Sequence, residues 1–292
     1  MTICKNRTVI ITGAGGGLGR AYALAFAAEG ASVVVNDIRP EAAEAVVAEV
    51  LAAGGQAIAN NGDITSMAGA QSIIDAALAA YGEVHVLVNN AGILRDRMFI
   101  SLSEDDWDEV MRVHLKGHFC LANLLGKRWR DQAKAGNPVD ARIINTSSGA
   151  GLQGSIGQSN YSAAKGGIAT LTLVQAAELG RYGVTANALA PAARTAMTEA
   201  GMPDMVKAPE DGSFDSWAAE NVAPLVVWLG SPESAHVTGK VFESQGGRIS
   251  MGDGWRTDAT RDKGARWEPA ELGPVIDQLL TEAVPAQKVW GS

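Results

Sequence analysis

Short apolar runs of strand length alternate with helical segments along most of the 292-residue chain. Runs that are apolar throughout, rather than at every second residue, are typical of a parallel sheet that helices cover on both faces. The pattern therefore predicts an α/β fold, a single Rossmann-like, doubly wound parallel sheet with helices on both faces. The expected strands are residues 8–12, 32–36, 57–60, 84–89, 141–146, 185–189 and, as the last strand, 241–244.

The segments between these runs are rich in alanine and are expected to form helices. Glycine often ends a helix and proline suits its first turn, so these two residues mark several of the boundaries. The expected helices are residues 18–29, 40–53, 66–81, 159–180 and a long helical region over 104–135.

Two segments depart from the alternation. Residues 192–215 are rich in Met, Pro, Gly and acidic residues, and we expect a mobile loop there. The segment after the last expected strand contains Trp255, Trp267 and Trp290, whose rings favour burial against the subunit or a neighbour. Because no linker divides the chain, the predicted arrangement is one domain over residues 1–250 and a C-terminal extension over 251–292.

Composition excludes several classes of function. The net charge is -8 and no basic block occurs, so nucleic acid is not an expected partner. The two cysteines, Cys4 and Cys120, form no cluster with histidines, so neither a disulfide framework nor a metal site is expected. No apolar run has the length of a membrane span or a signal sequence, and a cytoplasmic location without a membrane partner is expected.

A glycine-rich turn follows the first expected strand and opens the first expected helix. Backbone N–H groups at a helix start attract phosphate, and glycines let the chain approach it closely. The spacing, Gly13-x3-Gly17-x-Gly19, differs from G-x-G-x-x-G, and an ordinary glycine-rich turn remains an alternative. The candidate cofactor-binding residues of this turn are Gly13, Gly15, Gly17, Leu18 and Gly19.

Asp37 ends the second expected strand, close to twenty residues after the glycine turn. An acidic residue there accepts hydrogen bonds from ribose hydroxyls and repels a 2′-phosphate, which favours NAD over NADP. Arg39 lies two residues on and could accommodate that phosphate. A carboxylate that caps the helix starting at Pro40 is the alternative for Asp37.

Tyr161 and Lys165 are four residues apart on an expected helix and therefore share one of its faces. A nearby ammonium favours phenolate and lowers the pKa of a tyrosine from about 10 toward the working pH. A tyrosine with such a pKa can exchange a proton with a substrate oxygen. Taken alone, the spacing is weak evidence, because most such pairs lie on an exposed helix face.

Together these motifs resemble those of the short-chain dehydrogenase/reductase family over roughly residues 6–250. The resemblance rests on the glycine turn, on residues 89–92 (Asn-Asn-Ala-Gly), on Ser148 and on Tyr161-x3-Lys165. Runs such as residues 89–97, 113–117 and 222–229 are also similar to the (3R)-hydroxyacyl-CoA dehydrogenase domain of the type-two peroxisomal multifunctional enzyme, also known as a 17β-hydroxysteroid dehydrogenase. Without that enzyme's hydratase and sterol-carrier parts, the chain is expected to be a stand-alone bacterial relative.

The resemblance implies catalytic roles for four residues. Tyr161 would be the acid/base, Lys165 would lower its pKa and hold the nicotinamide ribose, and Ser148 would bind the substrate oxygen. Ser147 is a near neighbour, but the family spacing of thirteen residues before the tyrosine selects Ser148. His114 occupies a proton-relay position where many members carry asparagine; it would titrate near pH 6.5 and add pH dependence, or else be an ordinary helix histidine.

The resemblance also implies further cofactor contacts. Asn90 would lie beside the adenosine-side ribose and Asp63 beside the adenine, although Asp63 could instead cap a helix before Ser66. A strand-end turn is the alternative for Asn90 and Gly92. The remaining candidates are Ile64, Ala91 and Pro191, the last in a stretch that lacks the glycine commonly found after this proline.

The function implied is transfer of hydride between NAD and a secondary alcohol or ketone. A 3-hydroxyacyl-CoA is favoured, followed by a hydroxysteroid or a steroid-derived CoA ester. A 3-oxoacyl-carrier-protein reductase that uses NADPH is an alternative that Asp37 disfavours. A non-catalytic nucleotide-binding sensor is another, and the intact set of Ser148, Tyr161 and Lys165 argues against it. The family implies a homodimer or homotetramer, while the substrate and the direction of reaction stay open.

Overall fold

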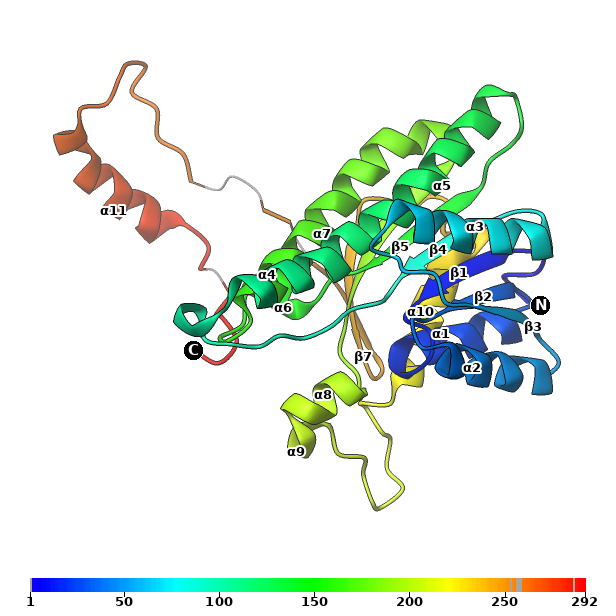
Figure 1. Ribbon diagram of the computed structural model, residues 1–292. Helices are drawn as coiled ribbons and strands as arrows, with labels where there is room; N and C mark the ends of the chain where they lie inside the picture. Colours follow the sequence, from blue (N-terminus) through cyan, green and yellow to red (C-terminus); the bar gives the residue numbers. More distant parts are fainter. Residues whose placement is uncertain (1, 253, 256–258, 286) are drawn as a thin grey trace.

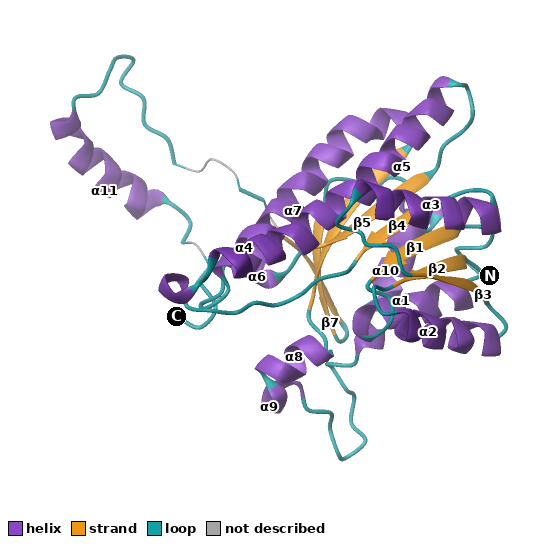
Figure 2. Cartoon of the chain, viewed as in Figure 1, coloured by secondary structure: helices purple, strands orange, loops and turns teal. Residues whose placement is uncertain are grey.

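The computed structural model describes residues 2–252, 254–255, 259–285 and 287–292. Within these residues, eight strands form one sheet in the order β3-β2-β1-β4-β5-β6-β7-β8 (Figures 1 and 2). Neighbouring strands are parallel from β3 to β7, which confirms the predicted doubly wound α/β sheet. The strands are β1 Thr8–Thr12, β2 Ser32–Asn36, β3 Gln56–Asn60, β4 Val86–Asn89, β5 Ala141–Thr146, β6 Val184–Pro191, β7 Val241–Gln245 and β8 Arg248–Gly252.

The prediction that the strand over 241–244 is the last one is wrong. The chain turns at Gly246, which has a φ of 53°, and β8 returns antiparallel to β7. Only Ile249 and Met251 are large and apolar in β8, and both are exposed, so the strand lacks the continuous apolar run of the others. The sheet therefore extends to Gly252, two residues past the predicted boundary at 250.

Helices cover both faces of the sheet. The α-helices are α1 Gly17–Ala28, α2 Pro40–Ala52, α3 Met67–Tyr81, α4 Glu104–Met111, α5 Gly117–Lys134, α6 Gly149–Gln153, α7 Ser159–Leu179, α8 Ala196–Gly201, α9 Pro203–Val206, α10 Ala223–Gly230 and α11 Leu272–Glu282. The 3₁₀ and π turns are η1 Phe99–Ser101, η2 Arg112–Lys116, η3 Gly180–Tyr182, η4 Ala219–Asn221, η5 Pro232–Ser234 and η6 Pro269–Glu271.

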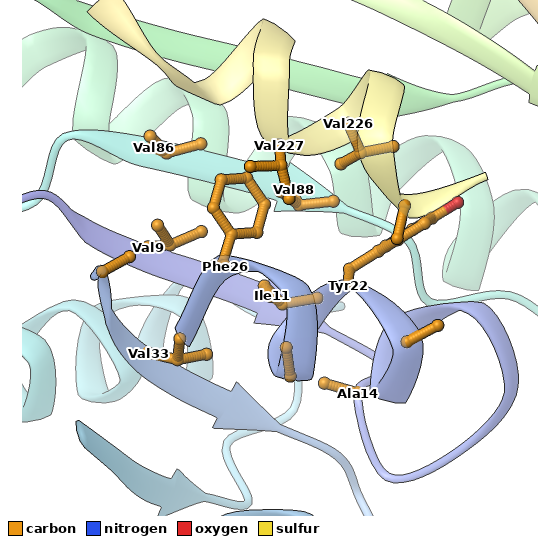
Figure 3. Packing of buried hydrophobic residues seen from close by; sticks show 14 of the residues in the cluster. Val9, Ile11, Ala14, Tyr22, Phe26, Val33, Val86, Val88, Val226 and Val227 are labelled. Carbon is orange, nitrogen blue, oxygen red and sulfur yellow. The ribbon is translucent and has the colours of Figure 1, made fainter. Parts of the chain in front are cut away.

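Each face of the sheet has its own hydrophobic core. Helices α1, α2 and α10 pack on one face, and α3, α5 and α7 pack on the other. Figure 3 shows Phe26 and Tyr22 of α1 between the sheet and Val226 and Val227 of α10. Burial of one such aromatic side chain stabilises the fold by about 1.5–3 kcal/mol. Both cores lie between the faces of the sheet and the helices. The carboxyl ends of the strands are therefore available for a site.

The predicted long helical region is interrupted by one turn of π-helix. Helix α4 ends at Met111, residues 112–116 form the π turn η2, and α5 continues from Gly117. A π turn inserts an extra residue into a helix and occurs frequently at functional sites. Periodicity did not reveal it, because the apolar pattern continues on both sides.

The segments outside the alternation contain more secondary structure than expected. Residues 192–215, predicted to be a loop, include the short helices α8 and α9, and Arg194 forms an ion pair with Asp215. In the C-terminal segment, Trp255 is 99% exposed, so its predicted burial against the subunit itself is wrong, while burial against a neighbour stays a prediction. No residue of α11 is buried (Figure 1). None of the helices in the described residues has the length and apolar character needed to cross a membrane.

Candidate active site

A cleft of about 730 Å³ lies beyond the carboxyl ends of the parallel strands. This edge of an open α/β sheet is where ligands bind. Ser148 and Gly19 are the two candidates that do not line it. The candidates that line it are Gly13, Gly15, Gly17, Leu18, Asp37, Asp63, Ile64, Asn90, Ala91, Gly92, His114, Tyr161, Lys165 and Pro191.

The glycine turn brings the start of α1 to the cleft. A Cβ on Gly13 would lie 2.7 Å from Ala91 Cα, and one on Gly19 would lie 2.4 Å from the carbonyl oxygen of Gly13. These two glycines therefore allow close packing of the turn. Helix α1 begins at Gly17 without a side-chain cap and without an acidic residue in its first turn. Uncapped N–H groups at a helix start are of the kind that attract phosphate, and the phosphate site at this turn stays a prediction.

Asp37 is fixed at the edge of the cleft by backbone donors. Its Oδ2 accepts a hydrogen bond from Gly15 N, and its Oδ1 accepts one from Arg39 N, both at 3.0 Å. The Arg39 side chain also donates to Oδ1, at 3.2 Å. Arg39 occupies the N-cap of α2, which has no side-chain cap, so the helix-cap alternative for Asp37 is wrong. The carboxylate and the guanidinium both line the cleft.

Asp63 is likewise not the cap of the helix that follows it. Ser66 caps α3 by accepting from Gly69 N, while the Asp63 carboxylate accepts from Thr65 N and Thr65 Oγ1, each at 2.9 Å. Burial would raise the pKa of Asp63, but the two Thr65 hydrogen bonds and the charge of Arg112 outweigh it and hold the pKa below its usual value. Asp63 thus stays ionised within the cleft.

Asn90 and Gly92 support the turn at the end of β4. The side-chain amide of Asn90 donates to the carbonyl oxygens of Thr12 and Gly13, at 3.0 and 3.2 Å. A Cβ on Gly92 would lie 2.4 Å from Cε1 of His114, so only glycine fits beside this ring. Both residues also line the cleft, where the resemblance expects a cofactor.

Ser148, Tyr161 and Lys165 meet at the junction of β5, α6 and α7. Ser148 is the N-cap of α6, where its Oγ accepts a hydrogen bond from Ala150 N at 3.2 Å. Tyr161 and Lys165 lie one turn apart on α7, with Lys165 Nζ 5.6 Å from the centre of the phenol ring. The Ser148 hydroxyl lies near enough to the Tyr161 hydroxyl to oppose the rise of its pKa. The structure thus brings together the three groups that the sequence predicted.

The predicted lowering of the Tyr161 pKa by Lys165 is not found. Burial raises the pKa of Tyr161, and the hydroxyl of Ser148 opposes this only in part. Lys165 is 2% exposed, and burial lowers its own pKa to about 7, which weakens its positive charge near neutral pH. Its amine donates to the carbonyl oxygen of Thr146 at 2.6 Å.

His114 is fully buried in the π turn, with its ring edge-on to Tyr161 at 5.2 Å between centroids. Its Nε2 lies 2.7 Å from Ile93 O and 3.0 Å from Ile93 N. Burial, together with the nearby charge of Lys165, lowers the pKa of His114 to about 3. The expected titration near pH 6.5 is therefore wrong, and the imidazole is neutral at physiological pH.

Two residues at the site were not predicted. His118, one turn after His114, is buried and accepts a hydrogen bond from Thr146 N at 3.3 Å. Arg112 lines the cleft and donates to Thr65 Oγ1 at 2.6 Å. The spacing of four residues between His114 and His118 places both on one helix face and could have indicated His118.

Comparisons with known proteins agree with this geometry. A family model described as short chain dehydrogenase matches residues 7–205. Hydroxyacyl-CoA dehydrogenase ChsB1 of Mycobacterium tuberculosis is 42% identical over 297 residues, which cover 98% of this chain and 92% of that protein. The crystal structure of a short chain dehydrogenase from Mycobacterium avium has a TM-score of 0.91 and 54% identity, with coverage of 99% of this chain and 100% of that one.

A second relative is a longer protein. Peroxisomal multifunctional enzyme type 2 of Mus musculus is 43% identical over 260 residues, which cover 86% of this chain but 32% of the mouse enzyme. The chain therefore corresponds to one part of that enzyme. Given the match over residues 7–205 and these identities, the chain belongs to the short-chain dehydrogenase/reductase family of oxidoreductases, which act on hydroxyl and keto groups.

Proposed function

We propose that the protein transfers hydride between NAD and the 3-hydroxyl carbon of a hydroxyacyl-CoA. The observation that carries this proposal is the junction of Ser148, Tyr161 and Lys165, of which Tyr161 and Lys165 line the same cleft as the glycine turn. The substrate class is supported by the relative named hydroxyacyl-CoA dehydrogenase, which aligns over 98% of this chain. A steroid-derived CoA ester belongs to the same chemical class, with a bulkier acyl group.

The side chains divide the proton chemistry between them. When bound, NAD supplies the hydride acceptor. Tyr161 takes the proton of the substrate hydroxyl, and Ser148, whose hydroxyl is next to that of Tyr161, holds the substrate oxygen beside it. Lys165 Nζ lies 5.6 Å from the centre of the phenol ring, and with NAD bound its amine would hold the nicotinamide ribose. The neutral imidazole of His114 packs edge-on against the phenol ring.

A preference for NAD over NADP is supported by Asp37. Its carboxylate is held at the end of β2 by Gly15 N and Arg39 N, in the position where ribose hydroxyls are bound in such folds. A 2′-phosphate would bring a second negative group against this carboxylate. Arg39 offsets part of that repulsion, but its guanidinium is already hydrogen-bonded to Asp37.

Arg95 offers a cationic group on the cleft lining for an anionic substrate. Arg95 lines the cleft, is exposed, and has a hydrogen bond from Nη1 to the neighbouring carbonyl of Leu94. Its guanidinium can therefore reach a phosphate of coenzyme A, since arginine binds phosphate with two parallel hydrogen bonds. Ile93 and Met197 supply apolar surface in the same cleft.

The test is a substrate panel with the purified full chain, followed by NADH absorbance. The panel contains (3R)- and (3S)-hydroxyacyl-CoAs of several lengths, a steroid-derived CoA ester, a free hydroxysteroid and a 3-oxoacyl carrier protein with NADPH. We expect the highest kcat/KM with NAD and a CoA ester. An equal or higher kcat/KM with the free hydroxysteroid, or with the carrier protein and NADPH, would overturn the assignment.

A further inference from the structure

We infer that the C-terminal residues 289–291 position the catalytic residues, and that Trp290 is a positioning residue for the reaction. The segment 154–158 connects α6, which Ser148 caps, to α7, which carries Tyr161. Trp290 N donates to Gly154 O at 3.2 Å, and Ile156 N donates to Trp290 O at 2.9 Å. Residues 155 and 290 thus form a parallel β-bridge.

Residues 96 and 97 form hydrogen bonds with the other side of the segment 154–158. Arg97 N donates to Gly157 O at 2.9 Å, and the Gln158 side-chain amide donates to Asp96 Oδ2 at 2.9 Å. The segment between the two catalytic helices is therefore the middle one of three adjacent backbone segments. Gly154 and Gly157 have φ angles of 82° and 77°, which side chains other than glycine rarely adopt.

Side chains of the C-terminus lie beside two glycines of this region, with Trp290 itself 49% exposed. A Cβ on Gly149 would lie 4.0 Å from Cζ2 of Trp290, and one on Gly154 would lie 3.5 Å from the methyl groups of Val289. The indole of Trp290 thus packs on the residue that directly follows Ser148. Loss of the indole would leave this first turn of α6 without its apolar neighbour.

Helix α6 also packs against the backbone of the catalytic lysine, so a displacement of α6 would displace Lys165. A Cβ on Gly151 would lie 2.6 Å from the carbonyl carbon of Lys165, so α6 lies directly against the backbone of α7. Ser147 Oγ also donates to the carbonyl oxygen of Lys165 at 2.8 Å. Because α6 has five residues, a shift at its C-terminal end moves Ser148 at its N-cap.

The rest of the C-terminal segment makes a suitable control. Trp255 is 99% exposed, and no residue of α11 is buried. Figure 1 shows the chain passing outward before α11, returning through α11 and ending near α6. A role that depends on contact with α6 is therefore expected of Trp290 and not of Trp255.

The kinetic test compares Trp290→Ala with Trp255→Ala, and it relies on the proposed function for its substrate. We expect Trp290→Ala to lower kcat about tenfold, since small displacements of reacting groups have effects of this size or larger. NAD affinity and Tm should match those of Trp255→Ala, and Trp290→Phe should recover most of the loss. An unchanged kcat, or a loss of kcat, NAD affinity and Tm together, would overturn the inference.

A second measurement is independent of turnover. Amide hydrogen exchange is followed in the full chain and in a variant that lacks residues 289–292. The Ile156 amide donates to Trp290 O, so its exchange should accelerate in the shortened chain while the amides of β1 keep their protection. Unchanged exchange at Ile156 would refute the contact itself, whereas failure of the substrate panel would leave this result intact.

Discussion

The amine of Lys165 donates a hydrogen bond to the carbonyl oxygen of Thr146, 2.6 Å away, at the last residue of β5. The backbone N–H of the same residue, Thr146, donates to His118 Nε2. A single strand terminus thus joins the catalytic helix α7 to the buried histidine of α5. Because this junction is buried, its ionisable groups have shifted pKa values that measurements of stability can detect.

Lys165→Met should stabilise the fold at acidic and neutral pH. The folded pKa near 7 lies below the ordinary value of 10.5, so the unfolded chain binds the proton more tightly. At about pH 6 we expect a gain of about 1–3 kcal/mol, after allowance for the hydrogen bond that Thr146 loses. The gain should shrink as pH rises from about 7 toward about 10, because protonation then ceases to favour the unfolded chain.

Urea unfolding of Lys165→Met and of the wild type at about pH 6 and about pH 9 measures this difference. Lys240→Met, at an exposed lysine, is the matched control and should show no such pH dependence. A gain that grows with pH would contradict the buried, weakly basic state of Lys165.

His114→Asn should reduce the acid sensitivity of the fold. The unfolded chain takes up a proton on this histidine below about pH 6.5, whereas the folded chain does so only near pH 3. Wild-type stability should therefore fall as pH decreases between these values, and part of that slope should disappear in the variant. The measurement is the free energy of unfolding against pH, with exposed His236→Asn as control. An equal slope in both variants would refute a buried neutral His114.

Asp37→Ala should shift cofactor preference toward NADP. Removal of the carboxylate removes both the acceptor for ribose hydroxyls and the repulsion of a 2′-phosphate, while Arg39 becomes free to bind that phosphate. We expect the ratio of kcat/KM with NADP to that with NAD to rise by about tenfold or more. The control is Asp75→Ala, at an exposed carboxylate on α3. An unchanged ratio would show that Asp37 does not select the cofactor.

Gly151→Ala should weaken both stability and activity. The added Cβ would lie 2.6 Å from the Lys165 carbonyl carbon and 2.7 Å from Gly166 N, so α6 must move away from α7. Such overpacking costs about 1–3 kcal/mol. At Gly180, where a Cβ meets nothing within 4 Å, alanine should be tolerated. Thermal unfolding and turnover of the two variants give the comparison, and equal behaviour would refute the close contact of α6 with α7.

The sheet could be predicted because its central strands are apolar on both faces. Runs such as residues 32–36 and 141–146 have the composition of buried strands, and the observed strands have the same bounds. The edge strand β8 was missed because Ile249 and Met251 alternate with polar residues and stay exposed. Its position is determined by pairing with β7 across the turn at Gly246, which is a tertiary effect.

Site residues could be predicted where a motif fixes them along the chain. Ser148, Tyr161 and Lys165 come together as expected, but the ionisation of Tyr161 and His114 was predicted incorrectly. Both errors have the same cause. Ordinary pKa values describe groups in water, whereas the packing of α5, α6 and α7 buries these side chains, and burial disfavours their charged forms.

Turnover by Tyr161→Phe shows whether the Tyr161 hydroxyl carries the proton in the proposed reaction. This change removes the hydroxyl alone, so NAD affinity and Tm should stay near the wild-type values while kcat falls by about 10²–10⁴-fold. Tyr182→Phe, at a partly exposed tyrosine after α7, is the control and should keep the wild-type kcat. If Tyr161→Phe oxidises its substrate at the wild-type rate, Tyr161 does not take the proton, and the account of this site is wrong.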